Sequence, residues 1–217
     1  RSGKYELIPA ERGEHAFVDM NPLFLGSVLA APYHFSFATA AFFHGLSTQA
    51  SATTYIATTV GKSRRLIVRD KEYRIVCQPT YKFFGAIEVN AYGSQVMMAE
   101  PEKVIVDCLD RPPYAGGIPE IVGMVWHGKA RFDWNRLADY ALQFQSQALV
   151  QRLGYLADLL ELSMSTLARE KLLAAIGKST PYLGAPKHWS IGGEYNAVWR
   201  VVDNIPRQIL LADMEVR

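Results

Sequence analysis

The feature that most constrains the fold is a change in the spacing of apolar residues near Pro101. Before it, short runs alternate apolar and polar side chains with a period of two, which is typical of half-buried β-strands. After it, apolar residues recur with a period near 3.6, as on the buried face of a helix. The first half therefore predicts a meander of antiparallel strands over residues 53–59, 65–69, 72–78 and 85–99, with turns at Asp70-Lys71 and Tyr92-Gly93.

Cap residues predict two helices ahead of this sheet. Asn21, followed by Pro22, predicts a short helix over 22–29. Ser36 predicts a second helix, which Gly45 ends. Together with the strands, these helices make up a mixed helix–sheet lobe that we expect over residues 21–125.

The helical half contains three apolar stripes. The first stripe follows Asp133, a predicted N-cap, and consists of Leu137, Tyr140, Ala141 and Phe144. The second consists of Leu149, Leu153, Leu156 and Leu160. The third consists of Leu172, Leu173 and Ile176, and Gly177 is its predicted C-cap. Residues 194–206 predict a closing strand. The expected fold class is α+β, with two N-terminal helices and a small antiparallel sheet followed by a mostly helical C-terminal half over 126–217.

Composition narrows the class of protein. The chain has 217 residues, of which 49% are hydrophobic and 20% charged, which is typical of a globular protein with a substantial core. Its net charge of +2 does not favour general binding to polyanions. The two cysteines form neither a metal-ligand spacing nor a disulfide framework, which is consistent with a reducing cytoplasm. No apolar run approaches the roughly 20 residues of a membrane span.

The segment 99–121 gathers several carboxylates and could be mistaken for an active site. Pro101 at the first helical position and Glu102 in the first turn are favourable at a helix N-terminus. Asp107 lies four residues from both Lys103 and Arg111, so ion pairs on a helix surface account for it. We therefore expect Asp107 and Asp110 to be surface residues of a capped helix.

Other chemistry has little support in the sequence. The run 123–130 resembles a phosphate-binding loop, but Ala130 replaces the hydroxyl residue that would hold magnesium. The five histidines show no metal-ligand spacing, and His44 fits a core position with a satisfied ring. Nucleases and nucleotidyltransferases hold divalent ions with clustered carboxylates, yet the chain has no Asp-x-Asp and no acid-x-Lys triplet. We expect no catalytic residue, no metal site and no cofactor.

Positive charge is concentrated in one predicted hairpin. Only Asp70 and Glu72 oppose six basic residues there, and the rest of the chain is net −2; the six are Lys62, Arg64, Arg65, Arg69, Lys71 and Arg74. Alternation places Leu66 and Val68 inward, with Arg65 and Arg69 outward. These residues either protect a sheet edge from aggregation by their charge or contact nucleic-acid phosphates.

The order of segments resembles one known family. A helix at 36–47, the basic strands, the helix and turn of 99–117, the helix at 148–161 and the segment 198–206 follow one another as in the AbiEi family. These proteins are antitoxins of abortive-infection, type IV toxin–antitoxin systems and transcriptional regulators of antiviral defence. The likeness covers nearly the whole chain from about Tyr5, although none of these segments is catalytic.

The resemblance implies a non-enzymatic, cytoplasmic regulatory domain that neutralises a nucleotidyltransferase-like toxin and supports autoregulation of its operon. Family members bind operator DNA through an N-terminal winged helix, and residues 1–20 would be its last strand or a linker. Two alternatives remain open at this point: a nuclease-like domain acting on nucleic acid, and a small-ligand sensor that controls a regulator.

Overall fold

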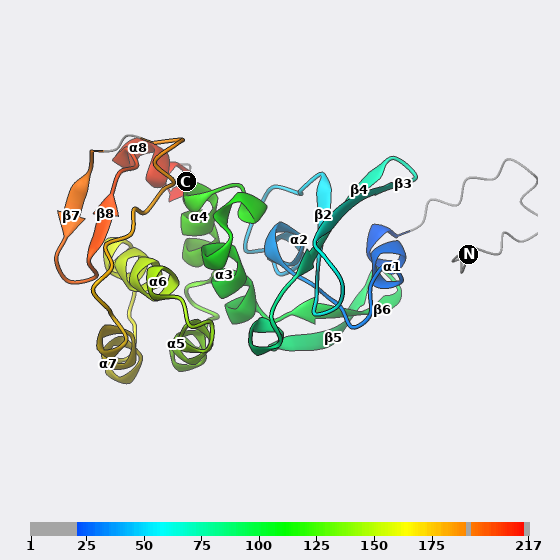
Figure 1. Ribbon diagram of the computed structural model, residues 1–217, viewed down its shortest axis with the longest axis horizontal. Coiled ribbons are helices and arrows are strands. Elements are labelled where there is room, and N and C mark those ends of the chain that lie inside the picture. Colours follow the sequence, from blue (N-terminus) through cyan, green and yellow to red (C-terminus); the bar gives the residue numbers. More distant parts are fainter. Residues whose placement is uncertain (1–20, 190–191, 215–217) are drawn as a thin grey trace, which may run out of the picture.

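The computed structural model describes residues 21–189 and 192–214. It is elongated, with a β-sheet at one end, a layer of helices in the middle and a small hairpin at the other end (Figure 1). The expected linker or wing strand of residues 1–20 lies outside the described residues. The fold class is confirmed, because two short helices and a sheet precede a mainly helical half.

The main sheet has six strands in the order β3-β4-β2-β1-β6-β5. It is mixed rather than antiparallel, because β2 pairs with β4 and β1 with β6 in parallel. The prediction of an antiparallel meander was therefore wrong for these pairs, and the short strand β1 (His34–Phe35) was not predicted. The other strands lie where alternation placed them: β2 Thr53–Thr58, β3 Arg64–Val68, β4 Lys71–Cys77, β5 Ala86–Ala91 and β6 Ser94–Ala99.

Two tight turns build the antiparallel hairpins of this sheet. Arg69 and Asp70 both have positive φ between β3 and β4, and Tyr92 with Gly93 repeats this between β5 and β6. Consecutive positive φ values match the right-handed twist of the flanking strands. The first turn lies one residue earlier than the sequence predicted.

Helices cover both faces of the sheet (Figure 1). On one face lies α1 (Pro22–Ser27), capped by the Asn21 side chain and ending earlier than expected. A Cβ atom at Gly26 would lie 2.8 Å from the ring of Phe35, so glycine permits the close approach of α1 to the sheet. On the other face lies α2 (Phe37–Phe43), where the hydroxyl of Thr39 accepts a hydrogen bond from the backbone of Tyr55 in β2.

The helix α3 (Pro101–Asp110) occupies the centre of the molecule. Eight of its ten residues are buried, since α2, α4, α5 and α6 all pack against it. The helices around and after it are α4 (Ile118–Gly128), α5 (Trp134–Gln143), α6 (Gln147–Leu159) and α7 (Thr166–Ala174). The boundary expected at 125/126 falls inside α4, and one buried cluster runs from Leu23 to Leu210 across it.

The C-terminal segment differs from the prediction. Instead of one closing strand it forms a hairpin of β7 (Glu194–Asn196) and β8 (Val201–Asp203), followed by α8 (Arg207–Leu210). Trp199 in the connecting turn is fully buried, which explains why the chain doubles back there. Among the described residues, no helix is long and apolar enough to cross a membrane.

Candidate nucleic-acid interface

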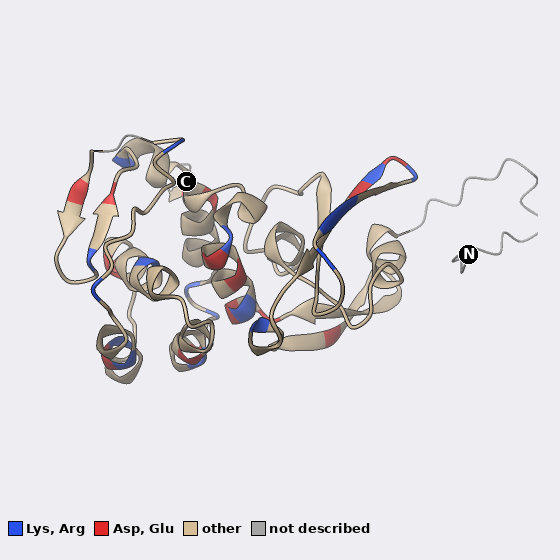
Figure 2. Cartoon of the chain, viewed as in Figure 1, with Lys and Arg blue, Asp and Glu red and all other residues tan. Residues whose placement is uncertain are grey.

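The basic residues predicted from the sequence lie on the β3–β4 hairpin, at one edge of the main sheet. Figure 2 shows Lys and Arg along this hairpin, where it projects from the sheet. Ile67 of β3 is 65% exposed, so the outer strand is open to solvent. Leu66 and Val68 are half-buried while Arg65 and Arg69 are exposed, as alternation predicted.

The hairpin has two faces, and its charges divide between them. Arg65 is paired with Arg74 in the β-ladder, so their side chains share one face. Arg64, paired with Ile75, points to the opposite face, as does Lys71, paired with Val68. The six predicted residues therefore do not form one continuous patch; Lys62 precedes the hairpin and Arg69 lies in its turn.

Some of the charge is already engaged within the hairpin. Arg65 donates a hydrogen bond of 2.6 Å to Glu72, and this contact lowers the pKa of the Glu72 carboxyl. The Arg65 side chain is 59% exposed, so the pair adds little to stability. On the other face, Arg64 donates to the carbonyl oxygen of Leu29 at 3.4 Å.

Arg74 belongs to a cluster that the sequence did not reveal. Its guanidinium lies 5.2 Å from the ring centroid of Tyr114, and that of Arg111 lies 5.9 Å from the same ring. The ring of Tyr55, from β2, lies 5.4 Å from Tyr114. Burial raises the pKa of the Tyr55 hydroxyl, which therefore remains protonated and able to donate a hydrogen bond. Together, Arg74, Arg111, Tyr55 and Tyr114 form an arginine–tyrosine cluster.

The sequence gives Arg111 and Tyr114 no role in binding, because the two prolines between them indicate only that a helix ends there. The chain does turn there: a short 3₁₀ helix, η3 (Pro112–Ala115), follows α3 directly. This turn places Tyr114 over the sheet, where it packs edge-on against Phe37 of α2 at 5.2 Å. An arginine immediately before Pro-Pro-Tyr was the only signal available, and it gives no indication of a partner distant in sequence.

A hollow of about 380 Å³ adjoins the arginine–tyrosine cluster. Tyr55 and Tyr114 form one wall, and Gly116, Glu120 and Met124 contribute to the remainder. The polar side chains of Ser47, Gln49 and Ser51 also line it. Burial raises the pKa of the Glu120 carboxyl, with a further contribution from Asp213.

A second polar group of residues is completely buried and corrects the prediction for Asp107. This residue was expected on the surface, yet its side chain and that of Lys103 are 0% exposed, with Nζ 2.5 Å from Oδ1. Ser36 Oγ donates to Asp107 Oδ2 at 2.5 Å, and Gln78 Nε2 donates to Oδ1 at 3.0 Å. Ser36 consequently makes no side-chain cap for α2. Because α3 is surrounded by other elements, its charged side chains must find partners inside the protein.

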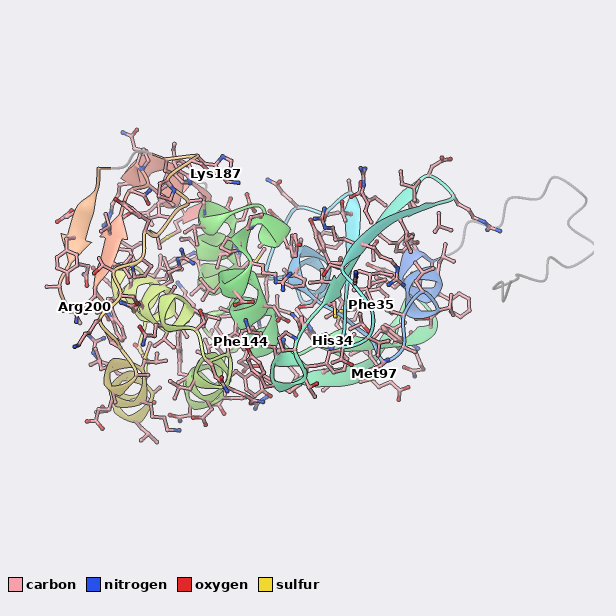
Figure 3. The ribbon with its side chains drawn as sticks, viewed as in Figure 1. His34, Phe35, Met97, Phe144, Lys187 and Arg200 are labelled. Atoms are coloured by element: carbon pink, nitrogen blue, oxygen red, sulfur yellow. The ribbon has the colours of Figure 1, made fainter. Side chains whose placement is uncertain are left out.

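His34 completes this buried group. Its ring packs against Phe83 at 4.6 Å, and burial lowers its pKa to about 4. Asp107 opposes this shift and Lys103 adds to it. In Figure 3 His34 and Phe35 lie in the sheet, while Phe144, whose ring is 4.9 Å from the Lys103 ammonium, lies beside α3. The group is enclosed by aromatic rings, so its role is structural.

Asp110 was also predicted to be a surface residue, and this was wrong. Its carboxylate pairs with Lys82 at 2.7 Å, and both side chains are mostly buried. The contact joins the end of α3 to the 3₁₀ helix η2 (Thr80–Lys82). Because η2 follows β4 directly, the pair connects the central helix to the sheet.

Other sequence motifs are placed as follows. Most of the run 123–130 belongs to α4, which ends at Gly128, so this run is not a phosphate-binding loop. Gly177 is not a C-cap, because α7 ends at Ala174; a Cβ atom there would instead meet the side chain of Gln147 at 2.1 Å. His44 is half-buried and its Nε2 lies 2.7 Å from the Ala99 carbonyl oxygen, as expected for a satisfied ring. Within the part of the chain that the structure describes, no group of three His, Cys, Asp or Glu could hold a metal ion.

Comparison with known proteins finds a similar fold among solved structures. No known protein family and no curated protein matches the chain. Among solved structures, it is similar to the crystal structure of RV2827C protein from Mycobacterium tuberculosis, with a TM-score of 0.63 over 88% of this chain and 68% of that chain. The two sequences are 18% identical, so the likeness shows a shared fold alone.

Proposed function

We propose that this chain is the antitoxin and regulatory part of an AbiEi-like regulator of phage defence. It would neutralise a nucleotidyltransferase-like toxin and support autoregulation of its operon, in the cytoplasm and without catalytic activity of its own. The resemblance in the order of its segments, from the helix at 36–47 to the segment 198–206, supports this proposal.

The observation that carries the proposal furthest is the cationic face of the β3–β4 hairpin. Arg65 and Arg74 lie on one face, and Arg111 from the end of α3 adds a third guanidinium beside Tyr114. Guanidinium groups bind phosphates through paired N–H donors. Such a face suits a protein that regulates nucleic acid, with sequence reading left to the winged helix that the family resemblance implies.

The direct experiment is a growth assay. The gene beside this one is induced in cells that either produce the chain or do not. We expect its product to arrest growth and the chain to restore it. The Asp107→Ala variant, which removes the buried partner of Lys103, serves as a destabilised control that should rescue growth less well than the parent chain.

Two results would contradict the proposal. The first is a neighbouring gene whose product does not affect growth. The second is arrest that persists although the chain is folded and abundant. Purified chain incubated with labelled RNA and magnesium provides a further test, since cleavage would favour the nuclease-like alternative.

A further inference from the structure

The arginine–tyrosine cluster and the hollow beside it share a wall. Tyr55 and Tyr114 line the hollow, while the guanidinium of Arg74 lies 5.2 Å from the Tyr114 ring centroid. A cationic site and a concave site therefore meet at two aromatic side chains. Glu120 also lines the hollow and contributes a carboxyl group.

We propose that this cluster and the hollow together bind an unpaired nucleic-acid strand, with a phosphate on Arg74 and Arg111 and the adjoining base in the hollow against Tyr55. This goes beyond the proposed antitoxin role, because it assigns a ligand class to a surface of this chain. It needs only the geometry of the described residues.

The shape of the site distinguishes an unpaired strand from a duplex. Duplex binding requires cations spread along the phosphate backbone, and the bases remain stacked inside the helix. A duplex bound in this way would leave the hollow of about 380 Å³, with its tyrosine walls, unoccupied. An unpaired strand can turn a base out, place it against an aromatic ring and lay its phosphates on nearby arginines.

The charges around the site predict which part of the ligand, the phosphate or the base, lies in the hollow. Arg74 and Arg111 lie beside the Tyr114 ring, whereas Glu120 and the polar groups of Ser47 and Gln49 line the hollow itself. A phosphate is attracted to the two guanidiniums and repelled by the Glu120 carboxylate. A base with an exocyclic amino group can instead donate a hydrogen bond to that carboxylate.

The two arginines are held in place before any ligand arrives. Arg74 is fixed by the β4 ladder and by the Tyr114 ring, and Arg111 follows the last residue of α3. The rigid placement of Tyr114 comes from its edge-on contact with Phe37, which is fully buried. Preordered donors lose less freedom on binding, which favours affinity.

The test is the binding of a short fluorescent RNA strand and of its blunt duplex, followed by anisotropy at fixed salt. The single strand should bind more tightly. Arg74→Gln and Arg111→Gln should each weaken it by about tenfold, as loss of a charge-assisted hydrogen bond implies. Tyr55→Leu should weaken it by about fivefold or more through lost stacking.

The matched control is Arg64→Gln, which makes the same charge change on the opposite face of the same hairpin. It should leave single-strand affinity unchanged, and thermal melts should show every variant folded. Equal binding of duplex and single strand, or equal weakening by Arg64→Gln, would overturn the inference. Because growth rescue is measured separately, loss of RNA binding with intact rescue would overturn this inference and leave the antitoxin proposal standing.

Discussion

At the scale of single residues, the most consequential feature is an ion pair in the centre of the protein. Lys103 and Asp107 are fully buried. The Asp107 carboxylate accepts hydrogen bonds from Ser36 and Gln78, whereas the Lys103 ammonium has Asp107 as its counter-charge and lies over two phenylalanine rings. Removing one partner of such a pair leaves an uncompensated charge in an apolar environment. The pair therefore tightly constrains how α2, α3 and β4 fit together.

We predict that Asp107→Ala lowers the free energy of unfolding by about 3–5 kcal/mol, because the Lys103 ammonium then has no counter-charge. Urea denaturation measures this. The exposed pair of Asp139 and Lys171 provides the control, and Asp139→Ala should cost at most about 1 kcal/mol. Equal effects of the two substitutions would mean that Asp107 is solvated.

The lowered pKa of His34 predicts how the stability of the protein depends on pH. Its pKa is about 4 in the folded protein against about 6.5 unfolded, so the unfolded state binds more protons between these values. Stability is therefore full above the unfolded pKa and is lost as pH falls toward about 4. The loss from this residue near pH 5 is about 2 kcal/mol.

Unfolding of the parent and of His34→Phe at neutral pH and near pH 5 tests this. The Phe variant keeps the stacking on Phe83 but cannot be protonated, so its stability should fall less on acidification. His44, whose pKa burial also lowers, remains in both proteins and cancels from the difference. Parallel pH curves for the two proteins would contradict the assignment.

At the scale of elements, α6 supports the helical half. Its leucine stripe was predicted from a 3.6-residue period, and Leu149, Leu153, Leu156 and Leu160 are all buried. Leu153→Ala should lower the free energy of unfolding by about 2–5 kcal/mol, as for other buried leucines. Leu167, which is 55% exposed in α7, is the control, and Leu167→Ala should change stability by at most about 0.5 kcal/mol. A parent-like melt for Leu153→Ala would contradict the packing.

For Gly154 in the same helix, the structure predicts that alanine destabilises the protein, which is the opposite of what helix propensity predicts. Alanine normally favours a helix interior by about 1 kcal/mol over glycine. Here a Cβ atom would lie 2.1 Å from the Trp199 ring, so Gly154→Ala should destabilise by about 1–3 kcal/mol. Combining it with Trp199→Leu should cost less than the sum of the two separate changes. Additive effects would show that the two residues are not in contact.

Sequence patterns predicted the elements better than their partners. Periods and cap residues are local, so α5 with its Asp133 cap and the strands β2 to β6 were found nearly in place. The parallel pairing of β2 with β4 depends on contacts across a connection, which no local pattern records. Asp107 was misplaced for the same reason, since a helix wheel cannot show that neighbours enclose a helix on all sides.

At the scale of the whole molecule, the candidate binding site depends on residues outside the basic hairpin as well as on the hairpin itself. The sequence predicted its charge, but not that Arg111 and Tyr114 would arrive from α3 and η3 to meet Arg74. The structure thus divides one basic segment into a face where Arg74 lies over the Tyr114 ring and an opposite face that carries Arg64 and Lys71.

The most direct test of this division is the salt dependence of single-strand binding for two double variants of equal charge. Arg74→Gln/Arg111→Gln removes two contacts proposed here, and Arg64→Gln/Lys71→Gln removes two charges from the other face. The slope of log affinity against log salt should become shallower by about 0.7 in the first variant, because the two arginines hold one phosphate and a single strand loses about 0.7 for each phosphate contact. The second variant should keep the parent slope. If both variants shift the slope equally, nucleic acid does not distinguish the two faces, and the proposed site is wrong.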